Sequence, residues 1–108
     1  MDVALKAIAD PTRRRILSLV WHDERPAGAI ASRFDMSQPA VSQHLKVLLD
    51  AGLVTLRREG TKRYYRANHQ AMAAVRRLIE DFWDERLAAL KDAAEAEQQA
   101  QRKSDDGR

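Results

Sequence analysis

The pattern of apolar and polar positions is clearest over residues 37–52. The apolar positions follow the i, i+4, i+7 spacing of one helix face: Val41, Leu45 and Leu48. Ser37 precedes this run and can accept a hydrogen bond from a free backbone N–H of the first turn. Gly52 follows it and readily adopts the left-handed conformation that ends a helix. The pattern therefore predicts an amphipathic helix between these two residues.

The opposite face of this helix carries amide, hydroxyl and ammonium groups and no carboxylate before Asp50. Its residues are Pro39, Ser42, Gln43 and Lys46, with Gln38 at the edge. Glutamine can bond adenine bidentately and serine can bond donors or acceptors, so the face suits a helix that meets base edges and phosphates. A solvated surface is an equally simple interpretation of this face taken alone.

Three shorter helices are predicted before this segment, over residues 2–9, 11 to about 22, and 27–34. Asp10 and Pro11 separate the first two, because a residue before proline is disfavoured in a helix and aspartate caps the next one. Residues 23–26 are predicted to form a polar turn, and Asp35 and Met36 a tight turn before residue 37. Two short helices of which the second exposes a polar face predict a helix-turn-helix.

Three arginines crowd the start of the second predicted helix, where cations oppose the helix dipole: Arg13, Arg14 and Arg15. We expect their charge to be offset by Asp10, by a partner helix or by an external anion. A structural role at this helix start is favoured over direct contact with DNA.

Residues 53–58 and 63–67 are rich in β-forming side chains and are separated by a turn that contains Gly60. They predict a two-stranded β-hairpin. This region contains a single acidic residue, Glu59, and five basic residues: Arg57, Arg58, Lys62, Arg63 and Arg66. A basic hairpin directly after a helix-turn-helix is typical of a wing that contacts phosphates or the minor groove. Arg57 and Arg58 should point to opposite faces of their strand, so at most one shares the DNA side of the tip.

A long helix is predicted from about residue 70 to the mid-nineties, with a broad apolar stripe. We expect this stripe and the first helix to form an isologous dimer interface, because a small winged core cannot cover both. The predicted interface residues are Val3, Leu5, Ile8, Val75, Ile79, Phe82, Trp83, Leu87 and Leu90. The alternative is a long helix that folds back over its own domain. A domain of residues 1–94 would then precede a polar, disordered tail, residues 95–108.

Composition narrows the classes of function. The 108 residues carry a formal charge of +3 and no cysteine, so disulfides and thiolate metal ligands are excluded. No apolar run approaches the ~20 residues that span a bilayer, and the N-terminus lacks a signal-peptide pattern. We therefore expect a cytoplasmic protein without membrane contact. A glycine-rich phosphate loop and a nucleophile–histidine arrangement are both absent, which argues against an enzyme.

Four segments in this order resemble the ArsR/SmtB family of bacterial winged-helix repressors. The matching stretches are residues 9–17, 37–48, 51–54 and 57–65. The resemblance implies a mainly α winged helix-turn-helix with a two-stranded hairpin. It also implies a homodimer built from the first and last helices. Such a dimer would bind an inverted-repeat operator, often in its own promoter, and an inducer would displace it.

The sequence departs from the metal-sensing members of this family. Those place cysteines in or beside the helix that corresponds to residues 27–34, or a spaced set of Asp, His and Glu along the last helix. Here the last helix has four carboxylates but no histidine beyond His69, and zinc prefers nitrogen and sulfur ligands. We predict no metal site and no cofactor, and the inducer is unknown. The alternative of a metal-responsive repressor that binds metal through carboxylates and His69 remains open.

Two classes of DNA contact are predicted for such a repressor. Base edges in the major groove would be read by Gln38, Ser42 and Gln43. Backbone phosphates would be held by Ser37, His44, Lys46, Arg57, Arg58, Lys62 and Arg63. Dimer symmetry would place two recognition helices about 34 Å apart, so a palindromic operator is expected. The alternative function is a winged-helix protein-interaction module that has lost DNA binding.

Overall fold

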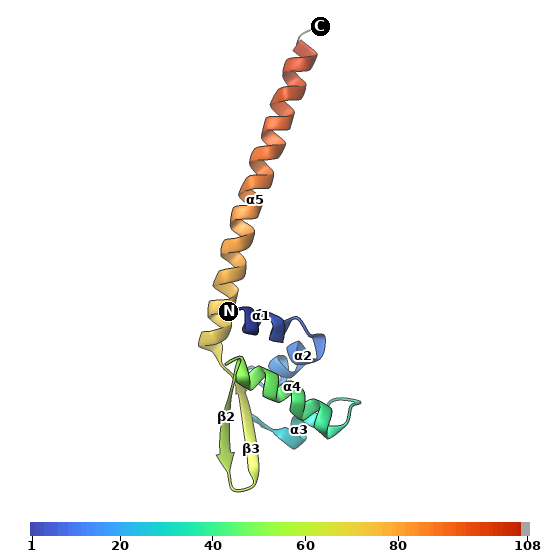
Figure 1. Ribbon diagram of the computed structural model, residues 1–108, viewed down its shortest axis with the longest axis vertical. Coiled ribbons are helices and arrows are strands. Elements are labelled where there is room, and N and C mark those ends of the chain that lie inside the picture. The colour runs from blue at the N-terminus through green and yellow to red at the C-terminus, as the bar shows by residue number, and fades with distance from the viewer. Residues whose placement is uncertain (107–108) are drawn as a thin grey trace. The chain divides into compact units, whose positions relative to one another are not determined.

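The computed structural model describes residues 1–106, which contain five helices and three strands (Figure 1). The helices are α1 (Asp2–Ile8), α2 (Pro11–Leu19), α3 (Ala27–Ala31), α4 (Gln38–Asp50) and α5 (His69–Asp106). The strands are β1 (Arg25–Pro26), β2 (Val54–Glu59) and β3 (Lys62–Ala67). The chain divides into two compact units, residues 1–75 and the helical segment from Arg76 onward. The succession of short helices and a β-hairpin confirms the predicted winged helix-turn-helix.

The core of the first unit is apolar and draws on every helix and on the hairpin. Its most deeply buried large side chains are Ile16, Val20, Ile30, Val41, Leu45, Leu48 and Leu53. Three of these form the predicted apolar face of α4, and all three are at most 1% exposed. The i, i+4, i+7 spacing therefore identified the buried face of α4 correctly.

Local capping fixes both ends of α4. The Ser37 hydroxyl accepts a hydrogen bond from the backbone N–H of Ala40 at 3.3 Å, and proline occupies the first turn, where its missing N–H costs nothing. Gly52 has a φ of +75°, a conformation that side chains with a Cβ rarely adopt. Asn68 donates to the carbonyl of Gly52 and accepts from the N–H of Ala71, so one side chain joins the end of α4 to the start of α5.

The arginines at the start of α2 are offset by α1. Arg13 donates from Nε to the carbonyl of Ala7 at 2.6 Å and from Nη2 to that of Lys6 at 3.1 Å. Arg14 donates to the carbonyls of Ile8 and Ala9. These carbonyls belong to the last turn of α1, where orphan acceptors carry the negative end of the helix dipole. The expectation of a structural role at this helix start is therefore confirmed for these two arginines, with a partner helix as the counter-charge.

The sheet has one more strand than we predicted. Residues 23–26 were expected to form only a polar turn, but β1 pairs antiparallel with β3, which gives the order β1-β3-β2. A strand of two residues is too short to show a period of two in the sequence. Pro26 also disfavours a strand assignment, although proline is tolerated on an edge strand such as this one.

The last helix is longer than predicted. It begins at His69 and continues through Asp106, whereas we expected it to end in the mid-nineties. The extra turns are rich in Gln, Glu and Ala, which are strong helix formers, and the next glycine is at 107. The boundary after residue 94 is thus not visible in the backbone. Disorder of residues 95–108 stays a prediction for the chain in solution, and residues 107 and 108 lie outside the described range.

Candidate nucleic-acid interface

A groove separates the polar face of α4 from the β2–β3 hairpin. It has a volume of about 420 Å³. Its polar lining comprises Ser42, Gln43 and Lys46 from α4, Arg58 from β2, and Arg63 and Tyr65 from β3. Two of the three predicted base-reading residues thus lie in one groove with three of the predicted phosphate-binding cations. We call this hollow the α4–hairpin groove.

The α4–hairpin groove is electropositive. None of its lining residues is acidic. Arg58 and Arg63 lie directly opposite each other in the β2–β3 ladder, and both are exposed. Like charges in this position destabilise a strand pair. Among the side chains that the structure describes, those of residues 1–103, neither arginine has an ion-pair partner. An anion bound in the groove would relieve this repulsion.

Lys46 is the third cation of the groove. Its Nζ lies 3.0 Å from Asp50 Oδ2, and both side chains are more than 60% exposed. An exposed pair at i, i+4 spacing is worth little and is readily exchanged for another anion. Lys46 therefore remains available to a phosphate.

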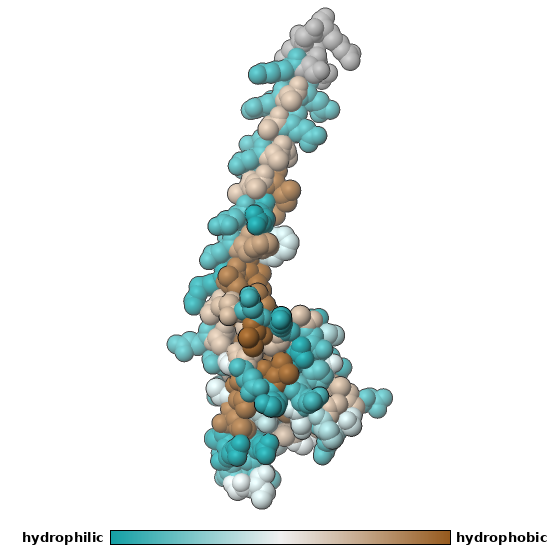
Figure 2. Space-filling view, viewed as in Figure 1, coloured by the Kyte–Doolittle hydropathy of each residue, from teal (hydrophilic) through white to brown (hydrophobic). Residues whose placement is uncertain are grey.

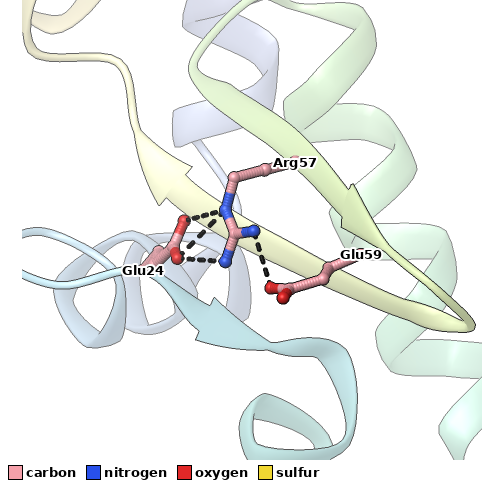
Figure 3. Close-up of polar contacts among 3 residues, drawn as sticks. All are labelled: Glu24, Arg57 and Glu59. Atoms are coloured by element: carbon pink, nitrogen blue, oxygen red, sulfur yellow. Dashed lines mark hydrogen bonds and ion pairs between the residues drawn. The ribbon is translucent and has the colours of Figure 1, made fainter.

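Arg57 lies on the outer face of the hairpin and makes a different set of contacts (Figure 3). Its Nη2 lies 2.6 Å and its Nε 3.1 Å from the two carboxylate oxygens of Glu24, and its Nη1 lies 2.8 Å from Glu59 Oε2. The guanidinium also stacks 4.5 Å from the ring centre of Tyr64. Hydrogen bonds from Arg57 hold the pKa of Glu24 below its usual range, and Glu24 and Glu59 together raise the pKa of Arg57. As strand alternation requires, Arg57 and Arg58 face opposite sides, and Arg58 is the one in the groove.

His44 is held by Arg13 from α2. The Nη1 of Arg13 lies 3.2 Å from Nδ1 of His44, which is half-buried. A guanidinium can only donate, so Nδ1 of His44 is the acceptor in this contact. The contact fixes the orientation of the His44 ring on α4. The same arginine is bonded to α1, so it connects α1 with α4.

The remaining predicted contacts lie around the groove. Ser37 is occupied as the cap of α4, and Gln38 is exposed in the first turn of the same helix. Lys62 lies at the hairpin tip and, with Arg63, lines a second hollow of about 560 Å³ against α3. The positive surface therefore extends from α4 to the tip of the hairpin.

Large apolar side chains are exposed along α5. Those from the second unit are Leu78, Ile79, Phe82, Trp83, Leu87 and Leu90, which are 38–64% exposed. Figure 2 shows hydrophobic surface along this helix. Phe82 and Trp83 form an edge-to-face pair with ring centres 5.7 Å apart.

The predicted interface residues outside this stretch are placed differently. Val3 in α1 is 61% exposed, whereas Leu5 and Ile8 are partly buried against their own core. Val75 was also predicted to lie at a dimer interface, but it is buried within its own chain. It is only 3% exposed and belongs to the core of the first unit, since the stripe of α5 begins by covering its own domain.

Among residues 1–103, whose side chains the structure describes, no group of three or more potential ligands is arranged to hold a metal ion. The same range contains no helix that is both long and apolar enough to span a membrane.

Sequence reasoning missed two contacts that organise this surface, the ion pair of Glu24 with Arg57 and the hydrogen bond between Arg13 and His44. Glu24 lies 33 residues from Arg57, and His44 lies 31 residues from Arg13. No helical or strand spacing connects such distant positions. Only the excess of arginines over nearby acids signalled that some of them had structural partners.

Comparisons with known proteins match this geometry. Residues 8–57 match a family model described as a helix-turn-helix domain. An HTH-type transcriptional regulator of Mycobacterium tuberculosis is 40% identical over 96 residues, which cover 89% of this chain and 90% of the relative. The transcriptional repressor SdpR of Bacillus subtilis is 43% identical over 63% of this chain and 76% of its own. A solved homodimeric winged helix-turn-helix DNA-binding domain from Mycobacterium bovis, a possible ArsR-family regulator, is 36% identical with a TM-score of 0.63, covering 78% of each chain.

Proposed function

The chain belongs to the ArsR family of winged helix-turn-helix transcriptional regulators, and from this premise we propose that it is a homodimeric repressor of an inverted-repeat operator. The observation that carries the proposal is the α4–hairpin groove. It combines base-reading side chains with three cations and no acid, and it holds an unrelieved pair of opposed arginines. A DNA strand supplies the missing negative charge.

In this proposal α4 enters the major groove. Ser42 and Gln43 line the groove from the exposed face of α4, and Gln38 is exposed in its first turn. Their amide and hydroxyl groups can bond base edges, and a good bidentate contact discriminates against a wrong base by about 1–3 kcal/mol. The buried opposite face of α4 fixes the orientation of these readers.

The cations set the register on the phosphate backbone. Lys46, Arg58 and Arg63 line the α4–hairpin groove, and Lys62 extends this surface at the hairpin tip. His44 adds the N–H of its other ring nitrogen, Nε2, because Arg13 occupies Nδ1. Such contacts position the protein without reading sequence. Arg57 is omitted from this set because its guanidinium already donates hydrogen bonds to Glu24 and Glu59.

The exposed apolar face of α5 is proposed to pair with a second copy of the chain. Residues 78–90, about three and a half helical turns, expose large apolar side chains, and an exposed apolar stripe of this kind marks an interaction surface. The homodimeric relative from M. bovis supports this assignment. A two-fold dimer binds half-sites about one DNA turn, or ~34 Å, apart. Repression would follow from occupation of the operator, which blocks polymerase.

Binding of the purified protein to its own upstream DNA tests this function. A scrambled duplex serves as the control, and both are titrated at two salt concentrations. Preferential binding by two subunits per site, with a steep salt dependence, supports an autoregulating dimeric repressor. Equal and weak binding to both duplexes means that the operator lies elsewhere. Failure to bind either duplex at low salt would replace the proposal with a protein-interaction module.

A further inference from the structure

We propose that Glu24 is a positioning residue for DNA binding, because its ion pair with Arg57 fixes the hairpin in the orientation that presents Arg58 and Arg63 to the phosphates. This inference rests on the proposed function. It assigns a role in polyanion binding to a carboxylate, which by charge alone would oppose it. We call the pair and its neighbours Glu59 and Tyr64 the wing latch.

The geometry of the wing latch is that of a directed contact. The guanidinium of Arg57 reaches both oxygens of Glu24 through two nitrogens, at 2.6 and 3.1 Å. Its third nitrogen lies 2.8 Å from Glu59 (Figure 3). Its Cζ lies 4.5 Å from the ring centre of Tyr64. Most exposed ion pairs contribute little, but a bidentate arginine in a network is the exception.

The wing latch joins the two edges of the sheet. Glu24 immediately precedes β1, Arg57 belongs to β2, and β3 lies between these strands. The side chain of Arg57 therefore crosses the outer face of β3 over Tyr64. The β1–β3 ladder ends at Pro26 and Tyr64, so no third strand supports the hairpin from there to its tip. The latch ties this end of the hairpin to the segment before β1.

The opposite face of the same strands carries two of the proposed DNA-binding cations. Arg58 follows Arg57 directly and pairs with Arg63 across the ladder. Rotation of the hairpin would move both arginines relative to α4. A hairpin that is already oriented does not have to be ordered when DNA binds, and this lowers the entropic cost of binding.

The loss of a negative charge and the loss of the ion pair with Arg57 predict opposite effects of Glu24→Gln on DNA affinity. Removal of a negative charge near DNA should tighten binding, whereas loss of the latch should weaken it. We expect Glu24→Gln to weaken operator binding about three- to ten-fold, within the range of a single oriented contact. Asp23→Asn is the matched control, since it removes the same charge from the adjacent exposed residue. It should leave binding unchanged or slightly tighter.

Two further measurements separate orientation from a general defect. Arg57→Gln should weaken operator binding as much as Glu24→Gln does, with an unchanged salt slope, because no phosphate contact is lost. A duplex trimmed so that the hairpin has no DNA to contact should bind the wild type and Glu24→Gln equally. A general folding defect would weaken both duplexes alike.

A readout without DNA keeps this inference separate from the proposed function. Hydrogen exchange of the hairpin amides in the free protein should be faster in Glu24→Gln than in Asp23→Asn. If wild type binds no DNA, the proposed function fails, while the exchange experiment still tests the latch. Tighter operator binding by Glu24→Gln, together with a lower salt slope for Arg57→Gln, would overturn the inference and make Arg57 a phosphate contact. Equal exchange rates in the two variants would also overturn it.

Discussion

Replacement of Arg63 by alanine tests the α4–hairpin groove most directly. Each subunit presents one Arg63 there, so a dimer loses two cations. Each phosphate contact contributes about 0.9 to the slope of log affinity against log salt, and the variant should therefore lose ~1.8 from the steepness of this slope. When the salt concentration is doubled from 0.1 to 0.2 M, the fold-decrease in affinity should therefore be about 3.5 times larger for the wild type than for the variant.

The assay is a salt titration of operator binding by fluorescence anisotropy. Arg66→Ala is the matched control, because Arg66 lies in the same strand but three residues away, on the outer face. Its slope should equal that of the wild type. If Arg66→Ala lowered the slope and Arg63→Ala did not, the DNA would contact the outer face of the hairpin, and our assignment of the groove would be refuted.

Four further variants probe the reading face, the core, the capping and the dimer. Gln43→Ala should weaken operator binding by about 1–3 kcal/mol more than random-sequence binding, and an unchanged specificity ratio in competition assays would remove Gln43 from the readers. Leu48→Ala should cost about 2–5 kcal/mol in urea unfolding, since Leu48 is fully buried, whereas exposed Val47→Ala should cost far less. Asp10 accepts hydrogen bonds from two backbone N–H groups, and these lower the pKa of its carboxyl group. The ionised carboxylate therefore stabilises the folded state at pH values above the usual carboxyl pKa, and this stabilisation is lost as the pH falls through the lowered pKa. Asp10→Ala should thus reduce Tm at pH 7 and flatten its decline in acid. Trp83→Ala should shift the chain toward monomer in sedimentation, and an unchanged dimer would place the interface elsewhere.

The fold was largely predictable because its elements are specified by local signals. The buried face of α4 follows from helical spacing, its start from Ser37 and its end from Gly52, which has the expected positive φ. The hairpin follows from two β-forming runs around Gly60, which also has a positive φ. The short strand β1 was not predictable, because it exists only through its pairing with β3. The end of α5 was misjudged because we equated the loss of large apolar residues with the loss of helix.

The sequence predicted only in part which arginines form ion pairs within the protein and which are left for an external anion. Alternation along β2 requires Arg57 and Arg58 to face opposite sides, but it does not say which side meets DNA. That choice depends on Glu24, which is brought to the outer face by the β1–β3 pairing. A carboxylate on one face neutralises the arginine there and leaves the other arginine to an external anion. In the proposed mode of binding, the position of Glu24 in the folded sheet, more than the number of basic residues, thus determines which face of the hairpin is left to contact DNA.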